Sequence, residues 1–235
     1  MKRINIFILV SLSFIFFSYG FIVGKFEIFP YQELKLLKKT FALNKIDRVE
    51  RNGEQRILMF QKFSPNAELA FIGDSITNEG EWSDFFPTLK VVNRGIGGDK
   101  TSDILARMDS ILSTKPNKAF IMMGINDIHR NISISKVLEN YEAIIDLLID
   151  ADIEVVVQST IQCELIICGS GHVQSVNLLN DSLNLLSTSK RIKFLHLGEL
   201  SSIGGLSSEY TYDGVHLNLS GYVFWVDKIL PLVKE

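Results

Sequence analysis

Short apolar segments alternate with amphipathic segments in the part of the chain that follows Glu68. The apolar segments are rich in β-branched or aromatic residues and are bounded by turn residues; they cover 69–73, 90–96, 118–124, 153–159 and 192–197. The segments with apolar residues at helical spacing cover 99–112, 135–151, 173–189 and 219–233. This alternation predicts five strands connected mostly by helices.

Strands that are apolar almost throughout, joined by helices, are typical of a parallel sheet that is covered on both faces. We therefore predict an α/β domain over residues 67–235, with three α/β/α layers and a five-stranded parallel sheet. In such sheets ligands bind outside the carboxyl ends of the strands, where the strand order reverses. The candidate chemistry should be sought at that edge.

The N-terminal part of the chain has a different pattern. From Ile4 to Gly24 there is no charged side chain, and two basic residues stand in front of this run. As a helix the run would be about 30 Å long, roughly the thickness of the hydrocarbon core of a membrane. We favour an N-terminal hydrophobic helix, a retained membrane anchor in residues 1–24. The alternatives are a cleaved signal peptide, which the small residues Ser18 and Gly20 would suit, and a buried core helix.

The orientation of this anchor is less directly indicated. Four lysines at 25, 35, 38 and 39 follow the run and outnumber the basic residues before it, so the positive-inside rule alone argues against export. A short basic N-terminal tail is nevertheless typical of a signal-anchor. We expect a membrane-anchored protein with its catalytic domain outside the cytoplasm, in the cell envelope, or secretion after signal cleavage. Residues 25–66 are predicted to form a juxtamembrane stalk, a solvated helix with one apolar edge, whose lysines could also meet anionic lipid headgroups.

Composition narrows the classes of partner and cofactor. The 235 residues are 46% hydrophobic with a net charge of −3, enough for one sizeable core and without the basic character of a nucleic-acid-binding protein.

Cys163 and Cys168 are five positions apart, which does not match CxxC spacing; a local disulfide and two buried thiols both remain open. No two histidines have zinc-ligand spacing, so we expect no metal and no cofactor. His129 and His172 are interpreted as surface groups, and His196 as part of a strand.

Polar residues follow four of the expected strands. Ser75 comes directly after the first, Gly98 after the second and Asn126 after the third, and the sequence DGVH, with Asp213 and His216, follows the fifth. A serine hydroxyl becomes a good nucleophile when a base removes its proton and a third group orients that base. Asp213 and His216 could supply both functions from one loop.

Acyl transfer also requires hydrogen-bond donors for the developing oxyanion. The side-chain amide of Asn126, the backbone N–H of Gly98 and that of Ser75 could provide them. The glycine has an alternative explanation, since it could serve only a tight turn with positive φ.

Four ordered blocks, FIGDSIT, VVNRGIGGDKT, MGINDI and YDGVHLNLSGY, together resemble the SGNH or GDSL hydrolase family of esterases and lipases. The resemblance extends from Glu68 to the C-terminus and implies a flavodoxin-like α/β/α fold. It implies that Ser75 is the nucleophile and His216 the base oriented by Asp213. It also implies that Gly98 and Asn126 form the oxyanion hole with the Ser75 amide, and that Asp74 shapes the turn. The GIGGD sequence is similar to that of platelet-activating-factor acetylhydrolases, lysophospholipase-like enzymes and carbohydrate acetylesterases.

The expected activity is therefore hydrolysis of a small-molecule, glycan or lipid ester, with short-acyl or O-acetyl esters favoured, through an acyl-Ser75 intermediate. Two alternatives remain: a non-catalytic module that binds glycan or lipid on the same fold, and an O-acyltransferase that shares the acyl-enzyme. The substrate pockets are formed by loops whose shape no motif reports.

Overall fold

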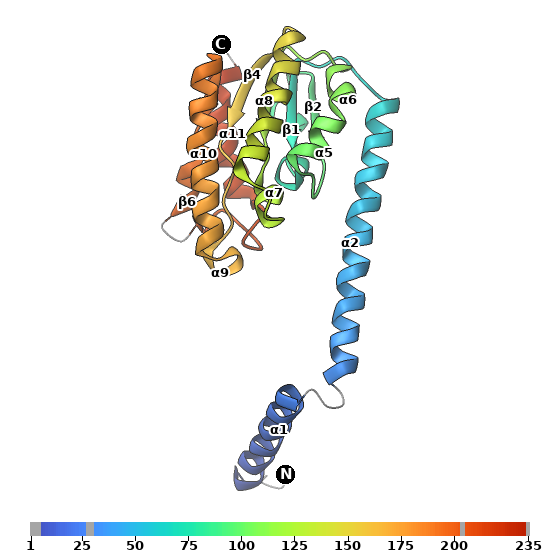
Figure 1. The fold of residues 1–235 in the computed structure, drawn as a ribbon, viewed down its shortest axis with the longest axis vertical. Coiled ribbons are helices and arrows are strands. Elements are labelled where there is room, and N and C mark those ends of the chain that lie inside the picture. The colour runs from blue at the N-terminus through green and yellow to red at the C-terminus, as the bar shows by residue number, and fades with distance from the viewer. Residues whose placement is uncertain (1–5, 27–30, 203–204, 234–235) are drawn as a thin grey trace. The chain divides into compact units, whose positions relative to one another are not determined.

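The computed structural model describes residues 6–26, 31–202 and 205–233. The chain divides between Arg51 and Asn52 into two compact units. The first contains α1 (Ile6–Phe26) and the beginning of α2 (Tyr31–Lys62), and the second contains the rest of α2 and all later elements (Figure 1).

The predicted membrane anchor is not supported. Residues 6–26 do form helix α1. A membrane-spanning helix needs about 20 consecutive, predominantly apolar residues. In the part of the chain that the structure describes, no helix combines the length and the apolar content needed to cross a membrane.

The second unit is built on a sheet of five parallel strands in the order β2-β1-β3-β4-β5. The strands are β1 (Leu69–Gly73), β2 (Val91–Gly95), β3 (Lys118–Met122), β4 (Glu154–Gln158) and β5 (Lys193–Leu195). They lie within the five predicted segments, so the predicted α/β architecture is confirmed. His196 follows β5 and is exposed, so its assignment to a strand was wrong.

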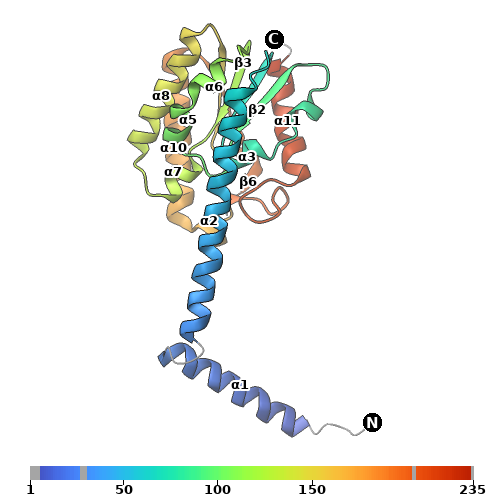
Figure 2. The ribbon, with the colours of Figure 1, turned by 90° about the vertical axis from the view of Figure 1, so that its right-hand side faces the viewer.

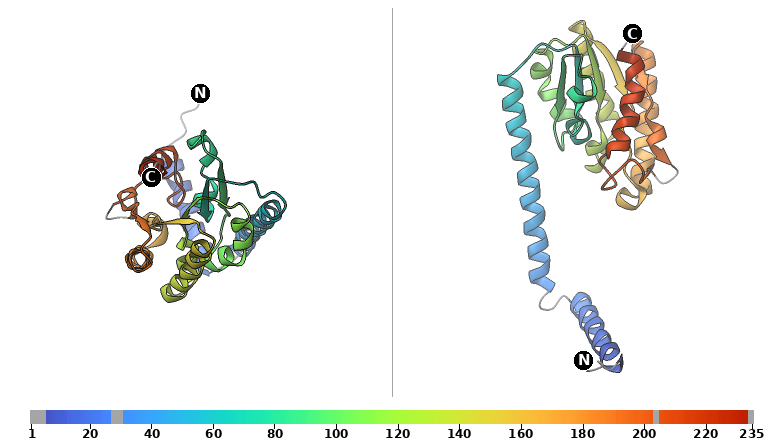
Figure 3. Two further views of the ribbon diagram at one scale, coloured as in Figure 1. Left: turned by 90° about the horizontal axis from the view of Figure 1, so that it is seen from above. Right: turned by 180° about the vertical axis from the view of Figure 1, so that it is seen from behind.

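Helices cover both faces of this sheet (Figures 2 and 3). In chain order they are α3 (Ser75–Asn78), α4 (Trp82–Phe85), α5 (Thr101–Ala106), α6 (Met108–Leu112), α7 (Ile125–His129), α8 (Ile134–Asp150), α9 (Leu165–Cys168), α10 (Ser170–Lys190) and α11 (Leu219–Val233). A short 3₁₀ turn (Gly198–Leu200) and the antiparallel pair β6 (Ser201–Ser202) and β7 (Gly205–Leu206) lie between β5 and α11.

Two hydrophobic cores arise because successive side chains of a strand point to opposite faces. On one face Ile72 and Ile121 pack with residues of α5, α6, α8 and α10. On the other, Phe71 stacks on Trp82 with ring centroids 3.9 Å apart, and Trp82 meets Trp225 of α11 edge to face. Nearly continuous apolar strands are thus needed to supply both cores.

The end of α2, from Asn52 onward, belongs to the second unit and packs on the rest of it. Arg56 donates a hydrogen bond from Nε to the carbonyl of Gly95 at 3.0 Å. Phe60 is buried, and the guanidinium of Arg94 lies 4.3 Å from its ring centroid. This packing explains why the second unit begins within α2, at Asn52.

Candidate active site

Ser75 lies where the strand order of the sheet reverses. β1 has β2 on one side and β3 on the other, and Ser75 begins α3 directly after β1. Gly73 at the end of β1 has no room for a side chain, since a Cβ there would lie 2.3 Å from the carbonyl oxygen of Met122. The fold therefore presents Ser75 at the position where open α/β sheets bind ligands.

Asp74 caps the short helix that carries Ser75. Its Oδ1 accepts a hydrogen bond from the backbone N–H of Ile76 at 3.0 Å. Its Oδ2 is buried and has no hydrogen-bond partner among the described residues. Burial raises the pKa of Asp74 to about 7 and outweighs the opposing effect of the Ile76 hydrogen bond. The residue shapes the turn, as the sequence predicted.

His216 and Asp213 come from the loop before α11 and continue a hydrogen-bond chain from Ser75. Nε2 of His216 lies 3.0 Å from Oγ of Ser75, and Nδ1 lies 2.7 Å from Oδ2 of Asp213. Asp213 Oδ1 accepts backbone hydrogen bonds from Val215 and His216. Partial burial would raise the pKa of Asp213, but these hydrogen bonds outweigh it and lower the pKa. Asp213 is therefore an ionised acceptor that can hold the proton of His216 on Nδ1.

The loop that carries this pair is fixed by its own backbone contacts. Thr211 donates from Oγ1 to the carbonyl of His216 at 2.6 Å and accepts from the N–H of Gly214 at 2.9 Å. The carbonyl of Gly214 accepts from the N–H of Glu164 at 2.7 Å. These bonds tie the loop to the segment that precedes α9.

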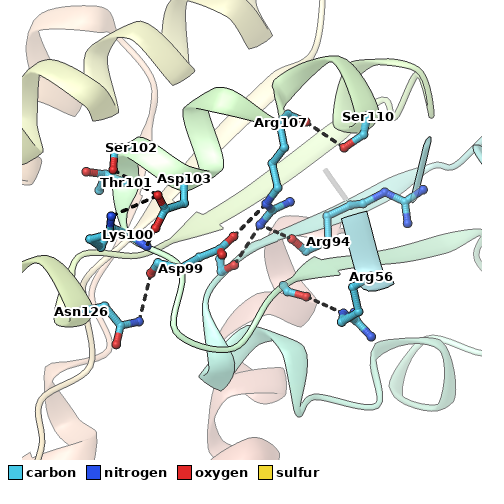
Figure 4. A network of polar contacts seen from close by, with 12 residues as sticks. Arg56, Arg94, Asp99, Lys100, Thr101, Ser102, Asp103, Arg107, Ser110 and Asn126 are labelled. Carbon is cyan, nitrogen blue, oxygen red and sulfur yellow. Dashed lines mark hydrogen bonds and ion pairs between the residues drawn. The ribbon is translucent and has the colours of Figure 1, made fainter. Parts of the chain in front are cut away.

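Asn126 and Gly98 belong to neighbouring loops of the same sheet edge. Gly98 has φ +83°, so the turn does require a glycine. Asn126 donates from Nδ2 to the carbonyl of Asp99 at 3.0 Å, which links α7 to the loop containing Gly98 (Figure 4). An amide nitrogen has two protons, so the second donor of Asn126 stays available.

A buried ion pair supports this loop. Arg107 Nε lies 2.8 Å from Oδ2 of Asp99, and its NH2 group donates to the carbonyls of Arg94 and Gly73 at 2.9 and 3.3 Å (Figure 4). Asp127 adds a second tie between α7 and the start of α5, since it accepts from the N–H and the hydroxyl of Thr101 at 2.9 and 2.7 Å. The backbone around Gly98 is thereby held in place.

Glu79 is a site residue that the sequence analysis missed. Its Oε1 lies 3.9 Å from Nε2 of His216, and its Oε2 accepts a hydrogen bond from the Tyr212 hydroxyl at 3.0 Å. Partial burial, followed by this hydrogen bond, raises the pKa of Tyr212 to about 12. Glu79 follows Ser75 by four positions, a spacing that places two residues on one side of a helical turn. That spacing was the available signal.

Cys163 and Cys168 form a disulfide, which decides between the two alternatives left open by the sequence.

Comparisons with known proteins agree with this architecture. Residues 71–224 match the sequence model of the GDSL-like lipase/acylhydrolase family. An acetylxylan esterase from Geobacillus stearothermophilus is 32% identical over 34% of this chain and 48% of its own length, so the chain spans about half the length of the curated relative it matches.

Solved structures show the same fold. A Streptococcus pneumonia protein provisionally named a platelet activating factor has a TM-score of 0.74 and 23% identity over 83% of this chain and 99% of its own. A GDSL-like lipase from Bacteroides thetaiotaomicron has a TM-score of 0.69 and 22% identity over 78% of this chain and 97% of its own. Because the family match covers more than half of the chain, the protein belongs to the GDSL-like lipase/acylhydrolase family.

Proposed function

We propose that the protein is a serine esterase that cleaves short-acyl or O-acetyl esters of a glycan or lipid through an acyl-Ser75 intermediate. Its family makes it a hydrolase that acts on esters. The observation that carries the finer proposal is the continuous hydrogen-bond chain from Ser75 Oγ through His216 to Asp213.

The proposed reaction uses each member of this chain. His216 Nε2 removes the proton of Ser75 as Oγ attacks the ester carbonyl, and it then gives the proton to the leaving alcohol. The Asp213 carboxylate keeps the other imidazole proton on Nδ1 and stabilises the positive charge that develops on the ring. His216 then removes a proton from a water molecule as this water attacks the acyl-enzyme. The imidazole returns the proton to Ser75 Oγ, which releases the acid and restores Ser75.

The oxyanion of the tetrahedral intermediate needs donors that are already oriented. We assign this function to the backbone N–H groups of Ser75 and Gly98 and to the side-chain amide of Asn126. The bond from Asn126 to the Asp99 carbonyl supports this assignment, because it limits rotation of the amide. Removal of one oxyanion donor typically lowers kcat by about 10²- to 10³-fold, which is the loss we expect for Asn126→Ala.

A direct test is labelling with a fluorophosphonate, which reacts covalently with an activated serine. We expect labelling of the native protein and none of Ser75→Ala. Ser189→Ala, a change of an exposed serine in α10, serves as the matched control and should be labelled normally. Unchanged labelling of Ser75→Ala would exclude the acyl-Ser75 mechanism. Hydrolysis of p-nitrophenyl acetate that depends on Ser75 would exclude a non-catalytic binding module.

The short-acyl preference is supported by the acetylxylan esterase relative, which acts on acetyl esters according to its name. The test is a comparison of kcat/KM for acetyl, butyryl and long-chain esters, with acetylated sugars and a lysophospholipid included. We expect acetyl esters to give the highest value. Clearly faster turnover of long-chain esters would contradict the proposal.

We also propose that the catalytic domain works outside the cytoplasm. The disulfide supports this location, because disulfides persist in oxidising compartments. The test is protease treatment of intact cells that express the full chain. Degradation of the domain without cell lysis is expected, and full protection until lysis would contradict the proposal.

A further inference from the structure

Four side chains able to bind a metal ion meet at one place outside the Ser75 site. They are His129, Cys163, Cys168 and His172, and their ligand atoms all lie within 4.8 Å of one another. His129 ends α7, Cys168 ends α9 with Cys163 shortly before it, and His172 is in the first turn of α10. The sequence predicted no metal and placed both histidines on the surface; His129 is exposed and His172 is partly buried. The cluster was missed because His129 is far along the chain from the other three residues.

His129 is oriented as a metal ligand would be. Its Nδ1 lies 2.9 Å from the carbonyl oxygen of Ile125, which can only accept, so the ring proton is on Nδ1 and the lone pair is on Nε2. Nε2 lies 3.6 Å from Sγ of Cys168. In a tetrahedral zinc site, Zn–S of about 2.3 Å and Zn–N of about 2.0 Å place the nitrogen and sulfur about 3.5 Å apart. Ligating histidines also commonly donate their second N–H to a backbone carbonyl.

His172 supplies a buried nitrogen without a partner. Its Nε2 is buried and has no hydrogen-bond partner among the described residues. Its ring centroid lies 4.2 Å from that of His129. An unsatisfied buried polar atom is costly, and a metal ion in this cluster would satisfy it.

The two cysteines complete the ligand set when their disulfide is opened. Their Cα atoms are 6.2 Å apart, and Cys163 is buried whereas Cys168 is partly exposed. Side-chain rotation at Cys168 can therefore separate the two sulfur atoms without moving the backbone far. Two thiolates and two imidazoles form a Cys2His2 set, which selects zinc among the common divalent ions.

We propose that the reduced Cys163 and Cys168, together with His129 and His172, bind one zinc ion, and that the disulfide form does not. A dithiol reductant transfers two electrons and two protons to the disulfide, and it leaves as its own disulfide. Zinc then binds the two sulfur atoms as thiolates and displaces the two thiol protons to solvent.

An open cavity gives the ion a route to this cluster. The cavity has a volume of about 550 Å³ and includes His129, Cys168 and His172 in its lining, with Ile128 and Ile167 as apolar neighbours. Access from solvent is one requirement for a metal site in a folded protein.

The cluster also lies next to both parts of the candidate active site. His129 follows Asn126 by three positions in α7. The backbone N–H of Glu164, next to Cys163, donates to the carbonyl of Gly214 in the loop that carries Asp213 and His216. Zinc would thus join α7 to α10 and to this loop, whereas the disulfide alone closes only the segment around α9.

The test uses Co²⁺ as a spectroscopic substitute for zinc in the full chain. The protein is reduced with dithiothreitol, desalted without oxygen, shown by thiol titration to have two free thiols, and mixed with one equivalent of Co²⁺. We expect visible bands of tetrahedral cobalt, a near-ultraviolet thiolate-to-cobalt band, and loss of both when zinc is added. The disulfide form should show none of these bands. Absence of the bands in the reduced protein, or equal bands in the oxidised protein, would overturn the proposal.

Variants distinguish this site from adventitious binding. Cys168→Ser should weaken the charge-transfer band, because only the Cys163 thiolate remains, and His172→Ala should lose the tetrahedral spectrum. His196→Ala, at a histidine outside the cluster, is the matched control and should keep both. Circular dichroism establishes that each variant is folded before metal is added. A spectrum unchanged in both Cys168→Ser and His172→Ala would show that cobalt binds elsewhere.

Discussion

Asp213 determines the protonation pattern of His216 because it accepts on both carboxylate oxygens. Oδ1 receives two backbone N–H groups and Oδ2 receives Nδ1 of His216. The backbone bonds alone would orient an asparagine equally well. The charge and the acceptor at Oδ2 are what a carboxylate adds.

This distinction makes Asp213→Asn informative. The amide nitrogen would face Nδ1, so the imidazole proton would move to Nε2, which could then no longer accept the proton of Ser75. We expect kcat to fall about 10⁴-fold with little change in KM. Steady-state kinetics on p-nitrophenyl acetate measure this, with Asp109→Asn, at an exposed position of α6, as the control. A loss below about tenfold would mean that Asp213 does not orient the base.

Glu79 places a second carboxylate near the same imidazole. Its negative charge lies 3.9 Å from Nε2, where it can stabilise the imidazolium that forms as His216 removes the proton of Ser75. For Glu79→Gln we expect kcat on p-nitrophenyl acetate to fall about two- to fivefold, a small effect because both side chains are partly exposed to solvent. Steady-state kinetics measure this, and Glu81→Gln is the control. An unchanged kcat would show that Glu79 serves only to hold Tyr212.

At the scale of elements, one predicted helix is two. The amphipathic pattern over 99–112 predicted a single helix, but the structure has α5 and α6 with a break at Arg107. The side chain at the break is buried and reaches Asp99 and two carbonyls. The break thus accompanies a buried contact that joins this segment to the loop of Gly98.

Arg107→Met should therefore leave the Asp99 carboxylate buried without its partner. We expect a loss of about 3 to 5 kcal/mol in the free energy of unfolding. The double variant with Asp99→Asn should lose less than the sum of the single changes, because no buried charge then remains. Urea unfolding measures all three, with Arg130→Met at an exposed position as the control. Strict additivity would show that the two residues do not interact energetically.

The sequence predicted those elements that are determined by residues close together in the chain. The five strands were found because their β-branched residues serve two cores. Ser75, Asn126 and the Asp213/His216 pair were predicted as site residues because each follows such a strand or belongs to a family motif, and the structure brings Ser75, His216 and Asp213 into one hydrogen-bond chain. The break at Arg107 and the meeting of His129 with His172 depend on residues far apart in the chain. Glu79 was missed because its four-residue spacing from Ser75 is common in helices and indicates a site only once His216 is placed beside it.

At the scale of the whole sheet unit, the reversal of strand order gathers the reactive loops at one edge, and it also buries Asp74 beneath them. A carboxyl group that is raised to a pKa of about 7 by burial affects the stability of the entire fold. Oδ2 of Asp74 has no hydrogen-bond partner among the described residues, so no hydrogen bond to this oxygen offsets the cost of a buried charge.

The sign of this effect follows from the two protonation states. Between pH 3.8 and about 7 the unfolded chain has lost the Asp74 proton and the folded protein keeps it, so stability falls as pH rises through this range. The slope from this group is at most about 1.4 kcal/mol per pH unit. Asp74→Asn retains an oxygen to accept from Ile76 and removes the titration, so its unfolding free energy should exceed that of the native protein by an amount that grows from pH 4 to 7. Urea unfolding across this range decides the matter, with Asp109→Asn as the control. A constant difference between the native protein and Asp74→Asn would mean that Asp74 is already ionised in the folded state, and that the cap at Ser75 carries a full negative charge.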